Sequence, residues 1–176
     1  MTDLNGDETT VIALLKQEVV AANPYGGSVF FSPRPFGNEL RGFTVAINDK
    51  QEFIAFSREP GGGYLTSLDT VDLNNYHVLT FRTRANSHEL FKGGSVVASD
   101  SNPSSWGLSN NGNIVLGKER HAALVDGYNF VGEIAEVLVF DQFIGNGDLF
   151  KINSYLAEKW GLTGSIDSDG DGTLAS

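Results

Sequence analysis

The chain ends in a run of alternating acidic residues. Within "SIDSDGDGTLAS", Asp167, Asp169 and Asp171 alternate with small residues, and Gly172 follows the third aspartate. A carboxylate at every second position with a glycine behind it is how a calcium loop begins, because Ca²⁺ takes several oxygen ligands around a sharp turn. These three aspartates are therefore the candidate ligands of a calcium ion.

The candidate loop is incomplete. A full loop of this type carries a bidentate glutamate at its twelfth position, and counted from Asp167 that position falls two residues beyond Ser176. The same acidic repeat is typical of linkers between domains, in which a neighbouring segment supplies the remaining ligands. A weaker candidate, Asp3 to Asp7, has Glu8 where the loop needs glycine.

Two glutamates near the end of the chain raise the question of glycoside hydrolysis, which needs a pair of carboxylates on one face. Glu133 and Glu136 are three positions apart, and odd spacing on a regular strand sends side chains to opposite faces. We therefore expect no catalytic pair here. Glu136 is expected to share a face with Ile134, Leu138 and Phe140, and to accept hydrogen bonds from backbone or an arginine.

Composition excludes several classes of partner. The net charge is −10 without a basic cluster, so the chain cannot neutralise a phosphate backbone or an anionic membrane surface. No apolar run approaches the roughly 20 residues needed to cross a bilayer. The chain has no cysteine, which excludes disulfides and thiolate metal sites. We expect neither nucleic-acid binding nor membrane insertion.

The elements that must position these side chains are mostly strands. Short runs of β-branched and aromatic residues are separated by turn residues at a spacing of roughly 8–12 residues, which is the pattern of an antiparallel sandwich or jelly roll. The first run, "TTVIALLKQEVV", is apolar throughout and predicts a strand buried on both faces. About eight strands are expected, in runs 9–20, 28–33, 43–49, 52–59, 76–85, 88–99, 113–120 and 127–141.

One segment near the C-terminus has helical spacing instead. Gly145 is the expected N-cap, Asp148 lies where a carboxylate favours the positive helix end, and Gly161 is the expected stop. This helix should pack its apolar side on the edge of the sandwich. The apolar residues that recur at helical intervals are Leu149, Ile152, Leu156 and Trp160.

The stretch "VGEIAEVLVFD", followed by "YLAEKWG", resembles the C-terminal signature of bacterial laminin-G-like domains of the concanavalin A-like lectin/glucanase superfamily. In that group a strand of the form G-x-I-A-E-V-x-V-(Y/F)-D leads into a helix ending Y-L-A-x-K-W-G. The likeness covers residues 9–162. The resemblance implies an all-β antiparallel β-sandwich, of the jelly-roll or concanavalin A-like type, with one C-terminal α-helix. Members of the family usually carry further strands ahead of residue 9.

The resemblance also implies a function. Domains of this group are non-catalytic modules of large bacterial surface proteins and adhesins that bind glycans or peptides, often with calcium at the rim. An extracellular or cell-surface location within a larger protein is therefore expected. The alternative is a structural domain associated with a virion or capsid, self-associating through sheet edges left open by the absent strands. A glycoside hydrolase is the third hypothesis.

Two loops are the candidates for ligand binding. A long polar loop carries Trp106 and Asn110, and aromatic rings stack on sugars while amides donate and accept hydrogen bonds. The alternative is that Trp106 folds back and anchors this loop on the core. The second candidate is Asp126, Tyr128 and Asn129, at a rim where the resemblance places ligand or calcium. A plain Asp-Gly turn is the alternative there.

The whole chain divides into three parts. Residues 1–8 form a polar lead-in, residues 9–164 the sandwich domain, and residues 165–176 an acidic tail or linker. The length of 176 residues suits one domain of ordinary size.

Overall fold

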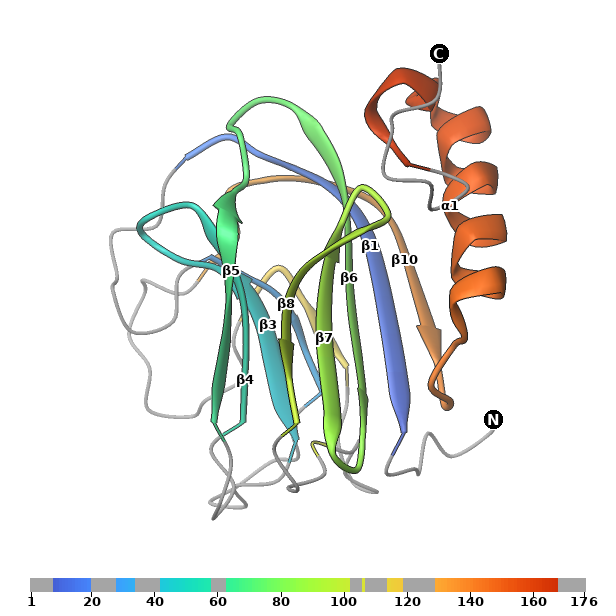
Figure 1. The fold of residues 1–176 in the computed structure, drawn as a ribbon. Helices are drawn as coiled ribbons and strands as arrows, with labels where there is room; N and C mark the ends of the chain where they lie inside the picture. Colours follow the sequence, from blue (N-terminus) through green and yellow to red (C-terminus); the bar gives the residue numbers. More distant parts are fainter. Residues whose placement is uncertain are drawn as a thin grey trace.

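The computed structural model describes residues 8–19, 28–33, 42–57, 63–101, 106, 114–118 and 129–167. These residues form two five-stranded antiparallel sheets and one helix (Figure 1). The predicted β-sandwich with a single C-terminal helix is confirmed. The sheet orders are β10-β1-β6-β7-β8 and β5-β4-β3-β2-β9. The elements are β1 Thr9–Gln17, β2 Ser28–Ser32, β3 Phe43–Ile47, β4 Glu52–Ser57, β5 Tyr64–Thr70, β6 Tyr76–Arg84, β7 Ser87–Lys92, β8 Ser95–Asp100, β9 Val115–Leu116, β10 Gly132–Phe140, the helix α1 Asn146–Trp160 and the 3-10 turn η1 Thr163–Ser165.

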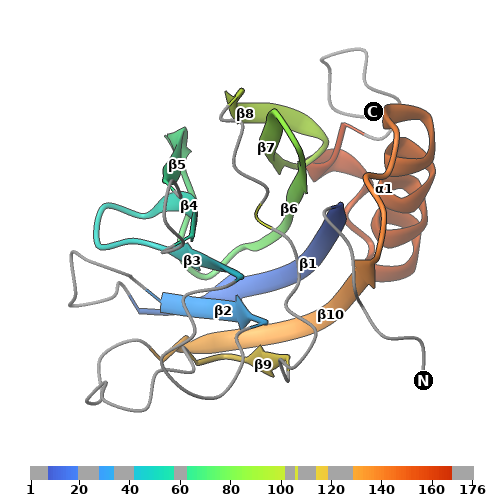
Figure 2. The same ribbon diagram turned by 90° about the horizontal axis from the view of Figure 1, so that it is seen from below.

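Strand β1 is buried on both faces, as its continuous apolar run predicts. It lies between β10 and β6, so every backbone group along it can pair within the sheet. Val11 and Leu15 face the other sheet, whereas Ile12 and Leu14 face α1. Figure 2 shows the helix lying outside the sheet along β10 and β1. Both faces of β1 therefore bury apolar surface, which explains why its sequence does not alternate.

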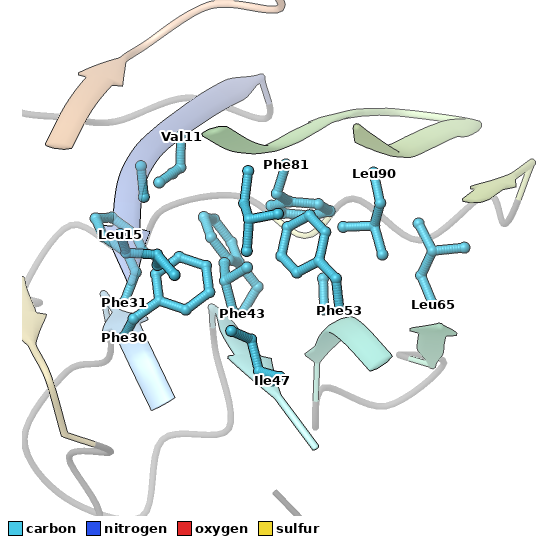
Figure 3. Packing of buried hydrophobic residues seen from close by; sticks show 14 of the residues in the cluster. Val11, Leu15, Phe30, Phe31, Phe43, Ile47, Phe53, Leu65, Phe81 and Leu90 are labelled. Carbon is cyan, nitrogen blue, oxygen red and sulfur yellow. The ribbon is translucent and has the colours of Figure 1, made fainter. Parts of the chain in front are cut away.

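The space between the two sheets is filled largely by aromatic rings, here called the inter-sheet core (Figure 3). The ring of Phe43 lies 4.8 Å from that of Phe81 and 5.9 Å from that of Phe31, measured between centroids. Phe30 and Phe53 pack 6.0 Å apart in the same layer. Phe81 comes from β6 of the first sheet and the other four rings from β2, β3 and β4 of the second, so the contact between Phe43 and Phe81 joins the two sheets.

The helix begins and ends where the sequence predicts. Gly145 is the N-cap, and Gly161 ends the helix in the left-handed conformation at φ 68°, with its N–H donating to the Ala157 carbonyl. Leu149 and Leu156 pack on the outer face of the first sheet. Within the described part of the chain, no helix is long and apolar enough to span a membrane.

The single run expected over residues 88–99 is two strands, β7 and β8, joined by a turn at Gly93 and Gly94. Strand β5 was not expected from the sequence at all. Its residues, "YLTSLDT", are mostly polar, and only Leu65 and Ser67 are buried. The strand lies at the edge of its sheet and pairs only with β4, so one of its sides needs no apolar partner. Leu68 is 96% exposed there, which removes the alternation that marks a half-buried strand.

Strand β10 contains a bulge that overturns the expected placement of its side chains. Leu14 of β1 pairs with Glu136, but the next residue, Leu15, pairs with Ile134, so Ala135 is an extra residue. The side chains before and after the bulge therefore follow different alternations. Ile134 packs into the inter-sheet core and does not share the face of Glu136, contrary to the sequence prediction. Glu133 and Glu136 lie on the same face, the one that α1 covers.

Candidate functional site

A pocket of about 670 Å³ opens at one end of the sandwich. It lies where the β5–β6 connection, the β7–β8 turn and η1 come together, at the end of the molecule where α1 terminates (Figure 1). Its wall contains two aspartates and two asparagines beside apolar residues, and Tyr76 adds an aromatic ring. We call this feature the rim pocket; its lining includes Asp69, Asp72, Asn74, Asn75, Tyr76, His77, Lys92, Gly93, Ser95 and Ser165.

Two turns with positive φ shape the walls of the rim pocket. Gly93 and Gly94, at φ 58° and 96°, make the tight turn between β7 and β8 that only glycine pairs adopt easily. Asn74 takes φ 64° in the β5–β6 connection, and its backbone N–H donates to the Gln17 carbonyl at 2.7 Å. Both walls are thus held by backbone geometry, which leaves the side chains available for a ligand.

The polar side chains of the rim pocket are exposed and carry an excess of negative charge. Within the described part of the chain, the side chains of Asp69, Asp72 and Asn75 make no hydrogen bond. The single lysine, Lys92, donates its Nζ to the Thr70 carbonyl at 2.6 Å. Two carboxylates and an amide are therefore free to accept or donate hydrogen bonds to a bound molecule.

Two pocket residues have shifted pKa values. The hydrogen bond to Glu133 raises the pKa of the Tyr76 hydroxyl. The pKa of His77 is shifted in the opposite direction. Burial lowers the pKa of its imidazole, and the nearby charge of Lys92 adds to this, while the contact of Nε2 with the Asp72 carbonyl at 3.1 Å acts in the opposite direction. The ring is neutral at pH 7 and adds no positive charge to the pocket.

A family model described as the concanavalin A-like lectin/glucanases superfamily, of the laminin G-like type, matches residues 2–147. The chain belongs to this superfamily. The match includes the whole of β10 but ends at the start of α1, so the helix half of the signature lies outside it. The predicted resemblance is confirmed. No curated protein matches the chain in sequence.

Solved structures of similar fold are distant in sequence from this lectin-like domain. The CBM40 of the Ruminococcus gnavus IT-sialidase, bound to α2,3-sialyllactose, has a TM-score of 0.65 at 16% identity, covering 83% of this chain and 82% of that one. A heptameric SAP-like pentraxin from Limulus polyphemus reaches 0.64 at 13%, covering 87% and 70%. Domain 4 of the arabinanase AbnA from Geobacillus stearothermophilus, in complex with arabinotriose, reaches 0.64 at 12%, covering 84% and 66%.

The two glutamates of β10 share a face in this member of the superfamily, so the expected separation by strand alternation is wrong. Both are instead engaged as ion-pair partners. Hydrogen bonds from Lys16 and then Tyr76 lower the pKa of Glu133. Hydrogen bonds from Trp160 and then Lys159 lower the pKa of Glu136. A glycosidase needs one carboxyl group with a raised pKa as its proton donor, and neither glutamate has it.

The two predicted ligand residues that the structure describes, Trp106 and Asn129, do not line the rim pocket. Trp106 is 0% exposed, and its indole stacks on His88 at 4.3 Å and on Phe81 at 5.9 Å between centroids. This placement corresponds to the alternative in which the ring anchors its loop on the core, and its face is not presented to a ligand. Asn129 is exposed and pairs with Val29 as an isolated bridge. Asn110, Asp126 and Tyr128 lie outside the described residues.

The predicted metal residues fall at the end of the described chain. Asp167 is 3% exposed, and its backbone N–H donates to the Gly93 carbonyl at 2.7 Å, so the chain after η1 is fastened to the β7–β8 turn. Asp169 and Asp171 lie outside the described residues. Among the residues that are described, no three acidic or histidine side chains come together in an arrangement that could hold a metal ion.

Sequence reasoning missed the rim pocket because its residues are spread over three segments that lie far apart in the chain. A signal was present in "TVDLNNYH", where Asp72, Asn74 and Asn75 form a short polar run between two strands. By itself such a run predicts only a turn, and it becomes part of a pocket because the fold brings the β7–β8 turn and η1 beside it.

Proposed function

We propose that the protein is a non-catalytic carbohydrate-binding module that takes a neutral glycan in the rim pocket. The observation that carries this proposal is the set of exposed, unbonded side chains of Asp69, Asp72 and Asn75 gathered around a concave site. Carboxylates and amides are the groups that accept and donate hydrogen bonds to sugar hydroxyls, and Tyr76 supplies an apolar ring in the same wall. The folds of the glycan-bound CBM40 and of AbnA domain 4 support carbohydrate binding in general, whereas the choice of a neutral glycan rests on the charge of the pocket.

The charge of the pocket argues for a neutral sugar. Lys92 supplies one positive charge against the two carboxylates of Asp69 and Asp72, and His77 is neutral, so the lining keeps an excess of negative charge. An anionic sugar such as a sialic acid would meet like charge, which is unfavourable at short range. The net charge of −10 acts in the same direction over longer distances.

The proposal also includes the location of the module and its lack of catalytic activity. The module works at the cell surface as part of a larger adhesin-like protein, as the family resemblance implies. It holds its ligand without turning it over, because the carboxylates of Glu133 and Glu136 are ion-paired with lowered pKa values. An array of neutral and sialylated glycans, with peptides as a separate panel, tests the ligand class directly.

A matched pair of variants tests the pocket. Asp72→Ala or Asn75→Ala should weaken glycan binding about three- to tenfold in calorimetry, the loss expected for one hydrogen bond. Asp49→Ala, an exposed aspartate in the β3–β4 turn, should leave the affinity unchanged. If Asp72→Ala and Asn75→Ala bind the glycan as tightly as the Asp49→Ala control, the glycan binds outside the rim pocket. Binding of sialylated glycans alone would contradict the charge argument, and release of sugar product from a bound glycan would contradict the non-catalytic function.

A further inference from the structure

Two aromatic side chains that are partly open to solvent are tied to strand β10 by their polar ends. The Tyr76 hydroxyl donates a hydrogen bond to the carboxylate of Glu133. In the same way, Nε1 of Trp160 donates to Oε2 of Glu136 at 2.8 Å. Because each polar atom is engaged and oriented, the part of these side chains that remains open is mostly aromatic ring.

The two anchoring glutamates lie close together on the face of the sheet that α1 covers. Glu133 is opposite Lys16 of β1. Glu136 is opposite Leu14, two residues away on the same strand, which corresponds to about 7 Å along the sheet. Tyr76 is opposite Lys16 on the other side of β1, so its side chain crosses β1 to reach β10, the strand that also holds the indole.

This aromatic pair is continuous with the rim pocket. Tyr76 lines the pocket, and so does Leu162, which follows Trp160 by two residues. Each anchoring glutamate also pairs with a lysine, so the charge beside the rings is balanced, unlike the charge of the pocket wall. The two ion pairs are Glu133 with Lys16 and Glu136 with Lys159.

We propose that Tyr76 and Trp160 form an aromatic subsite that binds a further sugar unit of the glycan held in the rim pocket. Aromatic rings with an engaged polar end offer an apolar surface on which an uncharged sugar ring can stack. This inference rests on the proposed function and narrows its ligand to an oligosaccharide that extends from the pocket to Trp160. Glu133 and Glu136 are positioning residues in this subsite, because they hold the two rings by their polar ends.

Tryptophan fluorescence can report on the subsite directly, because the two tryptophans of the chain have different environments. Trp106 is 0% exposed and Trp160 is 42% exposed, so the neutral quencher acrylamide should act on Trp160. In titrations with malto-, cello- and arabino-oligosaccharides of one to six units, the longer members that bind should protect Trp160 from acrylamide. Trp160→Phe leaves only Trp106 and should show little quenching, which checks the assignment.

Calorimetry with the same oligosaccharides tests the subsite through affinity. Trp160→Ala should weaken binding of the longest members about three- to tenfold, the loss expected for one aromatic contact, and leave binding of the shortest unchanged. Trp160→Phe keeps a ring and should retain more affinity than the alanine variant, and it serves if that variant fails to fold. The matched control is Tyr64→Ala, which removes an exposed ring that stacks on Phe56 in the other sheet and should leave every affinity unchanged.

The outcomes distinguish the subsite from the proposed function. The subsite is overturned, and the rim pocket retained, if Asp72→Ala weakens binding while Trp160 stays open to acrylamide and Trp160→Ala binds every length like wild type. The rim pocket is overturned, and with it a site continuous with the pocket, if the Trp160 variants lose affinity whereas Asp72→Ala and Asn75→Ala do not. Wild-type protein that binds none of the three series overturns both.

Discussion

Nε1 of Trp160 donates a hydrogen bond to Oε2 of Glu136 across 2.8 Å, joining the last turn of α1 to the strand beneath it. Lys159 reaches the same carboxylate at 2.9 Å and is itself held by the Tyr155 hydroxyl at 2.9 Å. The donors expected from the sequence were backbone groups or an arginine, and the structure shows an indole and a lysine instead. Two residues of the "YLAEKWG" stretch, Lys159 and Trp160, therefore bind a glutamate of the "VGEIAEVLVFD" stretch, and Tyr155 holds Lys159 in place.

Glu136→Gln tests the bond between α1 and β10 through the pH dependence of the melting temperature. The pKa of Glu136 is lowered in the folded state, so its stabilising effect is present above the unfolded value of 4.5 and is lost as pH falls through the folded pKa. At pH 7 the variant should melt slightly below wild type, by no more than about 2–4 °C, since the pair is partly exposed. The difference between the two melting temperatures should shrink toward pH 3, and a constant difference would contradict the assignment.

His77 should make the stability of the fold depend on pH in a higher pH range than Glu136 does. Its pKa is lowered by burial, so the unfolded state, with an ordinary value of 6.5, takes up a proton that the folded state resists. Stability should therefore fall as pH drops below 6.5 and continue to fall until the folded-state pKa is reached. His77→Gln should flatten the pH dependence of the melting temperature between pH 7 and pH 5. A wild-type slope in the variant would show that another group is responsible.

Arg82 is expected to be the most sensitive charged residue of the sandwich. Its guanidinium pairs with Glu89 at 2.5 Å and donates to the Ile144 carbonyl at 2.6 Å, in a site where the side chain is 5% exposed. Arg82→Ala would leave the buried Ile144 carbonyl and the half-buried Glu89 carboxylate without their partner, which costs about 3 kcal/mol. The melting temperature should fall by about 6–12 °C. Arg84→Ala, which removes only an exposed contact with Phe143, should change it little.

Gly94→Ala should detach the tail from the β7–β8 turn. The new Cβ would lie 2.0 Å from the Asp167 carbonyl oxygen, so the tail must move. Gly117 at φ 74° has a similar backbone conformation with nothing within 4 Å of its Cβ position, so Gly117→Ala costs only the strain, about 1–2 kcal/mol. Hydrogen exchange at the Asp167 amide should become fast in the first variant and stay slow in the second. Equal protection in both would show that the tail tolerates the added atom.

The fold could be predicted because its signals are local. The apolar run of β1, the glycine at each end of α1 and the asparagine-capped turn between β3 and β4 each act over a few residues. In that turn, Asn48 accepts hydrogen bonds from the backbone N–H groups of Lys50 and Glu52 at 2.9 Å, as the expected hairpin loop requires. Such local patterns can be recognised in the sequence without knowing which residues they contact in the folded protein.

The site could not be predicted in the same way because it depends on long-range contacts. The rim pocket needs residues near 70, 93 and 165 to meet, and only the assembled sheets bring them together. Trp106 illustrates the same limit, since its polar loop suggests a ligand contact whereas its ring is enclosed by His88 and Phe81.

The extra residue at Ala135 bears on how chains of this kind can vary in length. Removing Ala135 would leave Glu136 opposite Leu14 and Ile134 opposite Leu15, so the paired ladder would simply close up. Glu133 would remain opposite Lys16, and both acidic side chains would keep their present side of the sheet. A relative that lacks this residue can therefore keep the same sandwich. In a regular strand without a bulge, a one-residue deletion moves the following side chains to the opposite face of the sheet.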